Sequence, residues 1–206
     1  MTRSSTRRPS VAAPTKERIV EAAVRAYLKL GVSQTKTKDI ALEAKIDQPL
    51  INYYYPEADT LFLDVVRNVW AHLREFTVQH AFRNPDDPKA TLVGYIWAPF
   101  DWAVKNRGLF SIWVYFYHMA SDRDAFTQLS TSIRHGGRDR ISLILYSAIE
   151  KGIFEVPKGT SVAEVSILIQ GLITGNTIMA GTENPPQFKT FAKITEKTIL
   201  EMLSRK

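Results

Sequence analysis

The sequence of 206 residues predicts an all-α protein. Apolar residues recur at steps of three and four along most of the chain, which is the spacing of one helix face, and no convincing stretch alternates with a period of two. Glycines and prolines separate these stretches, most clearly in the Asn-Pro-Asp-Asp-Pro segment at 84–88. A hydrophobic content of 45% in a chain of this length is enough to form a sizeable core in one or two domains.

The first helix is expected to begin at Thr15 and to end at Gly31. Residues 1–14 are rich in Ser, Thr, Arg and Pro and predict a disordered basic arm. Thr15 can act as an N-cap, and Gly31 is the residue type that most often follows the end of a helix. The apolar residues between them predict one buried face: Ile19, Ala22, Ala23, Ala26, Tyr27 and Leu30.

Two short helices are predicted next. Thr37 is expected to cap a helix that runs to Ala44, and Asp47 to cap a third helix at 48–54. Pro49 is accommodated in the first turn of that helix, where a missing N–H costs little. Helices 1–3 would then form a small domain at 15–56.

Longer helices fill the rest of the chain, 57–206. The first, at about 57–82, has its apolar residues along one face and would connect the two domains. The later helices are expected at about 89–106, 108–119, 122–151, 161–182 and 187–204.

The excess of positive charge lies in the first quarter of the chain. The net charge is +6; residues 1–46 hold ten Lys or Arg against four Asp or Glu, and the remainder holds seventeen of each. A local basic segment is typical of a module that binds a polyanion. A solvated tail is the alternative, because half of the excess comes from Arg3, Arg7 and Arg8.

Residues 37–54 have the pattern of a helix-turn-helix. This motif needs two short helices, a tight turn and small residues where the helices cross, and Ala41 and Ala44 meet the last need. Ile46 and Ile51 are expected to fill the space between the helices. The outer face of the third helix then carries polar and aromatic side chains: Gln48, Leu50, Asn52, Tyr53 and Tyr54.

This outer face has the chemistry of a major-groove reader. The groove is about 12 Å wide and accepts a helix. Gln48 and Asn52 carry amides that can pair with adenine, and Leu50 can contact a thymine methyl. Hydroxyl groups and helix N-termini suit phosphate oxygens. Each residue taken singly is more often an ordinary surface or packing residue, but their convergence on one helix after a basic segment favours DNA binding.

The run from Ile40 to Pro56, followed by Leu61, resembles the DNA-binding domain of the TetR family of repressors. The family pattern is roughly Ile-Ala, two residues, Ala-Gly-Val, a short recognition helix ending in Tyr-His-Phe or similar, then a Lys and a Leu. The match covers about 15–62 without gaps. It implies that Thr37 and Tyr54 contact phosphates and that four residues approach bases: Lys38, Gln48, Leu50 and Asn52. The full set of predicted DNA contacts adds Pro49 and Tyr53.

Two departures from the family pattern affect the DNA contacts. Lys45 stands where the turn glycine is common, so a positive φ there would be strained or the turn would differ. Ala58 replaces a lysine that contacts phosphate in the family, and Glu57 and Asp59 beside it repel DNA. The other lysines of the segment and the arginine arm are expected to compensate.

The resemblance also implies that the C-terminal domain binds a small molecule and forms a homodimer. The helices at 161–182 and 187–204 are apolar, and Gly171 and Gly175 would allow close approach, so four such helices are expected to form a seam around a two-fold axis. The alternative is that both helices pack within one monomer.

A ligand pocket is expected within or near the aromatic-rich segment 95–119, where a flat or cationic ligand would fit. Ordinary core packing is the alternative for these aromatic residues. The candidate pocket residues are Trp97, Trp113, Tyr117 and Asn176.

The sequence therefore predicts a cytoplasmic, homodimeric transcription repressor that a small molecule releases from a palindromic DNA operator. No enzyme motif, metal-ligand spacing or cofactor loop is found, there is no cysteine, and no membrane partner is expected. The alternatives are an all-helical enzyme or ligand carrier with a basic tail and, less favoured by the near-neutral C-terminal domain, a protein that coats DNA.

Overall fold

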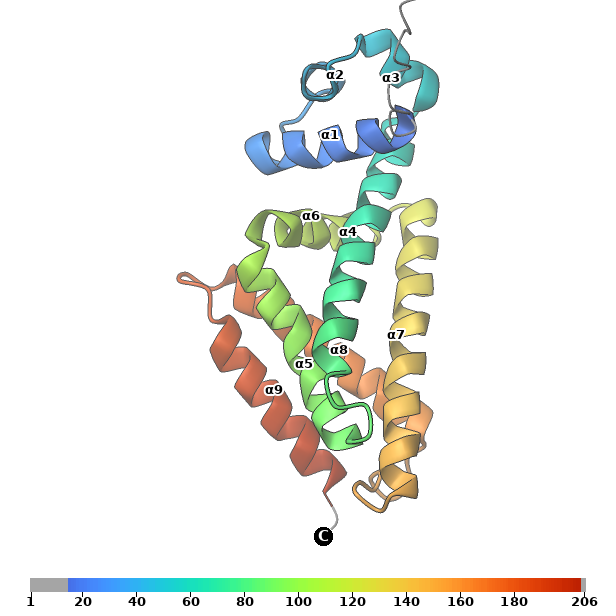
Figure 1. The fold of residues 1–206 in the computed structure, drawn as a ribbon, viewed down its shortest axis with the longest axis vertical. Coiled ribbons are helices and arrows are strands. Elements are labelled where there is room, and N and C mark those ends of the chain that lie inside the picture. The colour runs from blue at the N-terminus through green and yellow to red at the C-terminus, as the bar shows by residue number, and fades with distance from the viewer. Residues whose placement is uncertain (1–14, 205–206) are drawn as a thin grey trace, which may run out of the picture. The chain divides into compact units, whose positions relative to one another are not determined.

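The computed structural model describes residues 15–204, which form nine α-helices and no β-strand (Figure 1), and this confirms the predicted all-α fold. The predicted arm, 1–14, lies outside the described residues. The helices are α1 Thr15–Leu30, α2 Thr37–Ala44, α3 Gln48–Tyr54, α4 Ala58–Ala81, α5 Pro88–Lys105, α6 Arg107–Met119, α7 Asp124–Glu150, α8 Val162–Thr182 and α9 Phe188–Leu203.

The chain divides into two compact units between Asn68 and Val69, inside α4. The N-terminal unit contains α1, α2, α3 and the start of α4, and the C-terminal unit contains the remainder. The predicted connecting helix therefore contributes residues to both units. The division into domains at 15–56 and 57–206 stays a prediction.

In the N-terminal unit, α1 packs against α2 through small residues. Ala22, Ala23 and Ala26 are buried on the face of α1 that was expected to be inside. Leu30, predicted on the same face, is 49% exposed. It is the last residue of α1, and the end of a helix has fewer neighbours to cover it.

The cap of α2 differs from the sequence prediction. Lys36, with φ −107° and ψ 160°, occupies the N-cap position, and Thr37 is the first helical residue. The Asp39 carboxylate accepts a hydrogen bond from the Lys36 backbone N–H at 2.9 Å. The acidic side chain of the third helical residue thus accepts from the backbone N–H of the N-cap residue, which is one of the two hydrogen bonds of a capping box.

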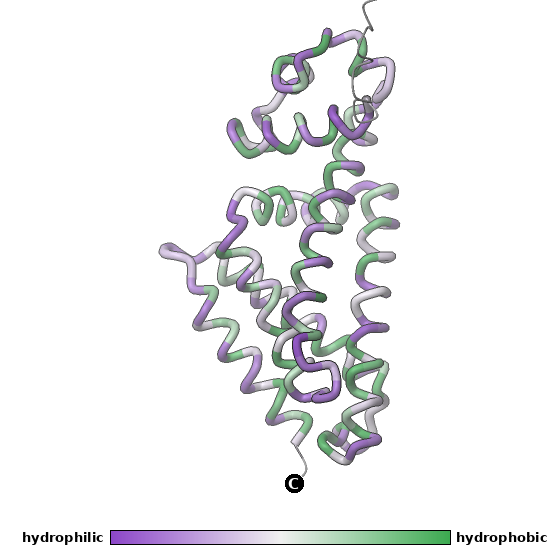
Figure 2. The backbone as a smooth tube through the Cα atoms, in the orientation of Figure 1, coloured by the Kyte–Doolittle hydropathy of each residue, from purple (hydrophilic) through white to green (hydrophobic). Residues whose placement is uncertain are grey.

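In the C-terminal unit, α7 packs on α8, α8 on α9, and α5 contacts α7, α8 and α9. Their shared core is aliphatic, with a few aromatic residues: Ala81, Leu92, Tyr95, Ile96, Ile141, Ile144, Leu145, Ala148, Phe154, Val165, Ile169, Ile173, Ile199 and Leu203. Figure 2 shows hydrophilic and hydrophobic residues alternating along α9, as expected of an amphipathic helix with one face on this core.

Candidate nucleic-acid interface and ligand pocket

The helix pair α2–α3 has the buried residues that a helix-turn-helix requires. Ala41 and Ala44 are each 6% exposed, and Ile51 of α3 is 1% exposed. Ile46, in the turn, is only partly buried. The small side chains on α2 leave room for the close crossing that was expected from the sequence.

Lys45 makes the turn between α2 and α3 in the left-handed conformation, with φ 54° and ψ 48°. Its backbone N–H donates to the Leu42 carbonyl at 3.2 Å, and the Ile46 N–H donates to the Ala41 carbonyl at 3.2 Å. These two bonds close the C-terminus of α2 in the way that usually calls for glycine. The turn thus keeps the expected geometry although lysine replaces glycine.

Lys45→Gly is expected to stabilise the N-terminal unit and to weaken its binding to DNA. A non-glycine residue in this conformation costs about 1–2 kcal/mol, part of which glycine gives back by freeing the unfolded chain, so the net gain is up to about 1 kcal/mol. Urea unfolding followed by circular dichroism measures this gain. Lys45→Gln removes the same charge without relieving the backbone, and equal stability of the two variants would show that the turn carries no strain.

The predicted DNA contacts of α2 and α3 are mostly exposed. Gln48, Pro49 and Asn52 are exposed, and Leu50 and Tyr53 are 38% and 79% exposed. Thr37 and Tyr54 are half-buried, and Lys38 is exposed in the first turn of α2. The rings of Tyr53 and Tyr54 meet edge-on, with centroids 5.2 Å apart. These placements leave the side chains available to a partner, and their role in DNA binding stays a prediction.

Among the described basic residues of the N-terminal unit, some form ion pairs and others do not. Lys36, Lys38 and Lys45 form no ion pair within the described part of the chain. By contrast, Lys29 and Arg25 both pair with Glu43. The hydrogen bond from Lys29 holds the pKa of the Glu43 carboxyl below its usual value, so this acid stays charged and neutralised by α1.

Tyr55 anchors α3 to α4 within the N-terminal unit, a contact that the sequence analysis missed. It is buried, and its hydroxyl donates to Asp64 Oδ2 at 2.9 Å. Burial, and then the Asp64 carboxylate, raise the pKa of the Tyr55 phenol, so it remains a neutral donor. The Lys16 ammonium lies 5.4 Å from the centre of its ring. The third tyrosine of the run is thus a packing residue.

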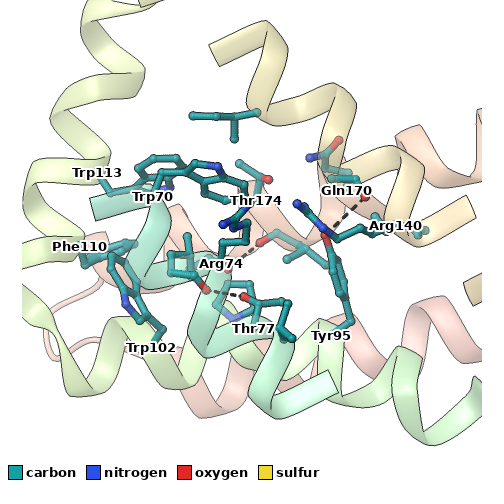
Figure 3. Close-up of a pocket in the computed structure, with 18 of the residues that line it drawn as sticks. Trp70, Arg74, Thr77, Tyr95, Trp102, Phe110, Trp113, Arg140, Gln170 and Thr174 are labelled. Carbon is teal, nitrogen blue, oxygen red and sulfur yellow. Dashed lines mark hydrogen bonds between the residues drawn. The ribbon is translucent and has the colours of Figure 1, made fainter. Parts of the chain in front are cut away.

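The C-terminal unit contains a pocket lined by α4, α5, α6, α7 and α8. The pocket is partly open to solvent. Trp70 and Trp113 lie parallel there, with ring centroids 5.7 Å apart (Figure 3). Further aromatic and aliphatic residues complete an apolar lining, among them Tyr95, Trp102, Phe110, Tyr117, Ile133, Ile141 and Ile173.

Two of the four candidate pocket residues line this pocket and two do not. Trp113 and Tyr117 are in the lining. Trp97 instead donates its ring N–H to Glu196 Oε2 at 2.6 Å, and Asn176 donates to the Thr195 hydroxyl at 2.8 Å. Both therefore tie neighbouring helices to α9. Residues that the sequence analysis did not single out complete the pocket: Trp70, Arg74, Arg140 and Gln170.

The outward face of α8 is apolar although little of it is covered. By length and composition alone α8 could cross a membrane, and 28% of its 18-residue apolar stretch is buried. Ile167, Leu168 and Met179 are 45%, 52% and 54% exposed. A Cβ added at Gly171 or Gly175 would meet no atom within 4 Å. The chain itself thus leaves open space over both glycines.

The proteins found to be similar to this chain in sequence are transcription regulators. No family model matches the chain. Over 163 residues it is 22% identical to the HTH-type transcriptional regulator BetI of Burkholderia thailandensis, covering 79% of this chain and 82% of that protein. Over 98 residues it is 28% identical to the HTH-type transcriptional repressor NicS of Pseudomonas putida, covering 47% of this chain and 46% of that one.

Solved structures match nearly the whole chain. A TetR transcription regulator from Haloarcula marismortui superposes with a TM-score of 0.81 at 18% identity, covering 92% of this chain and 98% of that chain. A Saccharomonospora viridis structure, described as a transcriptional regulator in complex with choline, gives 0.79 at 17% identity and covers 93% and 98%. At these identities the likeness establishes the fold.

Proposed function

We propose that this chain, which has the fold of TetR-family transcription regulators, is a regulator that binds operator DNA through α3. The comparisons confirm the predicted resemblance to that family. The observation that carries the proposal is the set of exposed polar side chains on α3. This helix follows the left-handed turn at Lys45, and three lysines without ion pairs precede it: Lys36, Lys38 and Lys45. A repressor that leaves a palindromic operator when a small molecule occupies the C-terminal pocket fits this arrangement. One relative is named a repressor.

A second copy of the chain is the partner that best explains the outward face of α8. Glycine in a helix interior costs about 1 kcal/mol relative to alanine, and among the described residues no atom lies within 4 Å of a Cβ added at Gly171 or Gly175. Close approach of a second α8 accounts for both glycines and for the exposed apolar residues around them. Ile194 of α9 is 53% exposed and extends the face. We therefore assign the homodimer interface to α8 and α9. We further propose that the protein is cytoplasmic and has no membrane partner.

The base-reading assignment predicts different losses for two kinds of variant. Gln48→Ala and Asn52→Ala should each cost about 1–3 kcal/mol of discrimination between operator and unrelated DNA, because base edges lose their amide partners. Lys38→Ala should weaken binding to all sequences if it touches phosphate alone, and lower the slope of log affinity against log salt by about 0.9. Gel-shift titrations on the DNA upstream of its own gene measure both effects.

Gln128→Ala is the matched control, since Gln128 is an exposed amide on α7 in the other unit. It should leave the affinity and the salt slope unchanged. If Gln48→Ala and Asn52→Ala reduce binding to operator and to unrelated DNA equally, α3 does not read bases.

A further inference from the structure

The C-terminal pocket contains two cationic side chains and no acidic one. Arg74 of α4 and Arg140 of α7 are in its lining, which includes no Asp, Glu or His. Figure 3 shows the guanidinium groups of Arg74 and Arg140 directed toward the interior of the pocket, among the other labelled side chains. Within the part of the chain that the structure describes, neither arginine forms an ion pair. The pocket therefore carries uncompensated positive charge.

Arg140 is half-buried and lies beside a buried phenol of the pocket, whereas Arg74 is exposed. Its guanidinium carbon is 6.0 Å from the centre of the Trp70 ring. Burial raises the pKa of the Tyr95 phenol, and the neighbouring Arg140 guanidinium opposes that rise. Burial likewise raises the pKa of Tyr117. Charge interactions are stronger where water is scarce, so an anion that enters this space gains more from Arg140 than it would at the surface.

The remaining lining defines what the anion is attached to. The parallel rings of Trp70 and Trp113 offer flat apolar surfaces, and Phe110 extends them. Gln170 contributes a buried Oε1 that has no hydrogen-bond partner among the described residues. A ligand with an apolar body and an N–H or O–H group would cover the rings and satisfy this oxygen.

We propose that the effector is an organic acid whose carboxylate binds Arg74 and Arg140 and whose apolar body lies against Trp70 and Trp113. The inference rests on the proposed function, because it takes this pocket as the effector site. The proposed ligand class, an organic acid, differs from the cation choline that is bound in the Saccharomonospora viridis structure. A quaternary ammonium would be attracted by the aromatic rings but repelled by two guanidinium groups, and no carboxylate in the lining would offset this repulsion.

Calorimetric titration of the full-length protein, without DNA, tests the ligand class. The probes are indole-3-acetate and decanoate as acids, indole-3-acetamide as the neutral counterpart of the first, and choline as the cation. We expect saturable binding of at least one acid. If indole-3-acetate binds, its affinity should exceed that of the amide by about tenfold or more, which corresponds to one charge-assisted hydrogen bond. Binding of neither acid overturns the proposal, as does choline binding as tightly as the acids.

Arginine variants locate the carboxylate. Arg140→Gln and Arg74→Gln should each weaken binding of the acid about tenfold or more. Arg83→Gln, an equal charge change at an exposed residue outside the pocket, should leave it unchanged. Equal losses in all three variants would mean that net charge, not the pocket, attracts the acid. DNA binding is measured separately: a protein that binds the acid but no operator refutes the proposed regulator, and one that binds operator but no acid refutes only the ligand class.

Discussion

Leu168→Asp is expected to separate the proposed dimer into monomers and to weaken operator binding by about 10²–10⁴-fold. Leu168 is 52% exposed on the outward face of α8, close to the sites where added Cβ atoms would meet open space. A carboxylate buried there between two copies would have no partner and would disfavour association. Each monomer could then hold one half-site only, and the gain from binding two sites at once would be lost.

Sedimentation velocity measures the separation, and gel shifts measure the loss of operator binding. Leu143→Asp is the matched control, because Leu143 is an exposed leucine of α7, 69% exposed, outside the proposed seam. This control should remain dimeric. If Leu143→Asp separates the copies and Leu168→Asp does not, the seam lies along α7, and the assignment to α8 and α9 is wrong.

Gly94→Ala should destabilise the C-terminal unit by about 3 kcal/mol, at the upper end of the range for overpacking. A Cβ at this position would lie 2.6 Å from the His80 carbonyl oxygen and 2.9 Å from the Ala81 Cα. Both atoms belong to the backbone at the end of α4, so no side-chain rotation can relieve the clash. The end of α4 must move away from α5, and Ala81 and Leu92 would lose core contacts there.

Gly136→Ala provides the opposite expectation at a second helical glycine. Nothing lies within 4 Å of a Cβ added to Gly136 in α7, so the substitution should stabilise the helix by up to about 1 kcal/mol. Urea unfolding of both variants gives the two free energies. If both variants change the free energy of unfolding by the same amount in the same direction, α4 and α5 do not approach each other as closely at Gly94 as the structure shows.

The helices could be predicted because their signals are local. Gly31, Asp47 and Pro56 mark helix ends within the sequence itself, and the observed bounds of α1 and α3 follow them. Lys45 adopts the turn conformation of a glycine, and two backbone hydrogen bonds close the turn there. Thr37 shows the limit of such signals: it is a common N-cap residue type, yet the N-cap is Lys36, whose backbone N–H donates to Asp39.

The pocket could not be predicted in the same way, because it depends on which helices meet. Arg74 and Arg140 lie on different helices, far apart in the sequence, and neither has a local pattern that points to a ligand. Trp97 and Asn176 looked equally suitable for a pocket, but each instead donates a hydrogen bond to a residue of α9. Tyr55 likewise could not be separated from its two neighbours until its bond to Asp64 was seen.

Selection of binding sites from a library of random DNA duplexes by the full-length protein tests the regulator assignment most directly. The account predicts enrichment of one inverted repeat, with half-site centres about 34 Å apart, or a whole number of helical turns, so that two copies of α3 reach successive major grooves. Binding that enriches no sequence and vanishes as salt is raised would contradict it, since charge alone would then hold the protein on DNA.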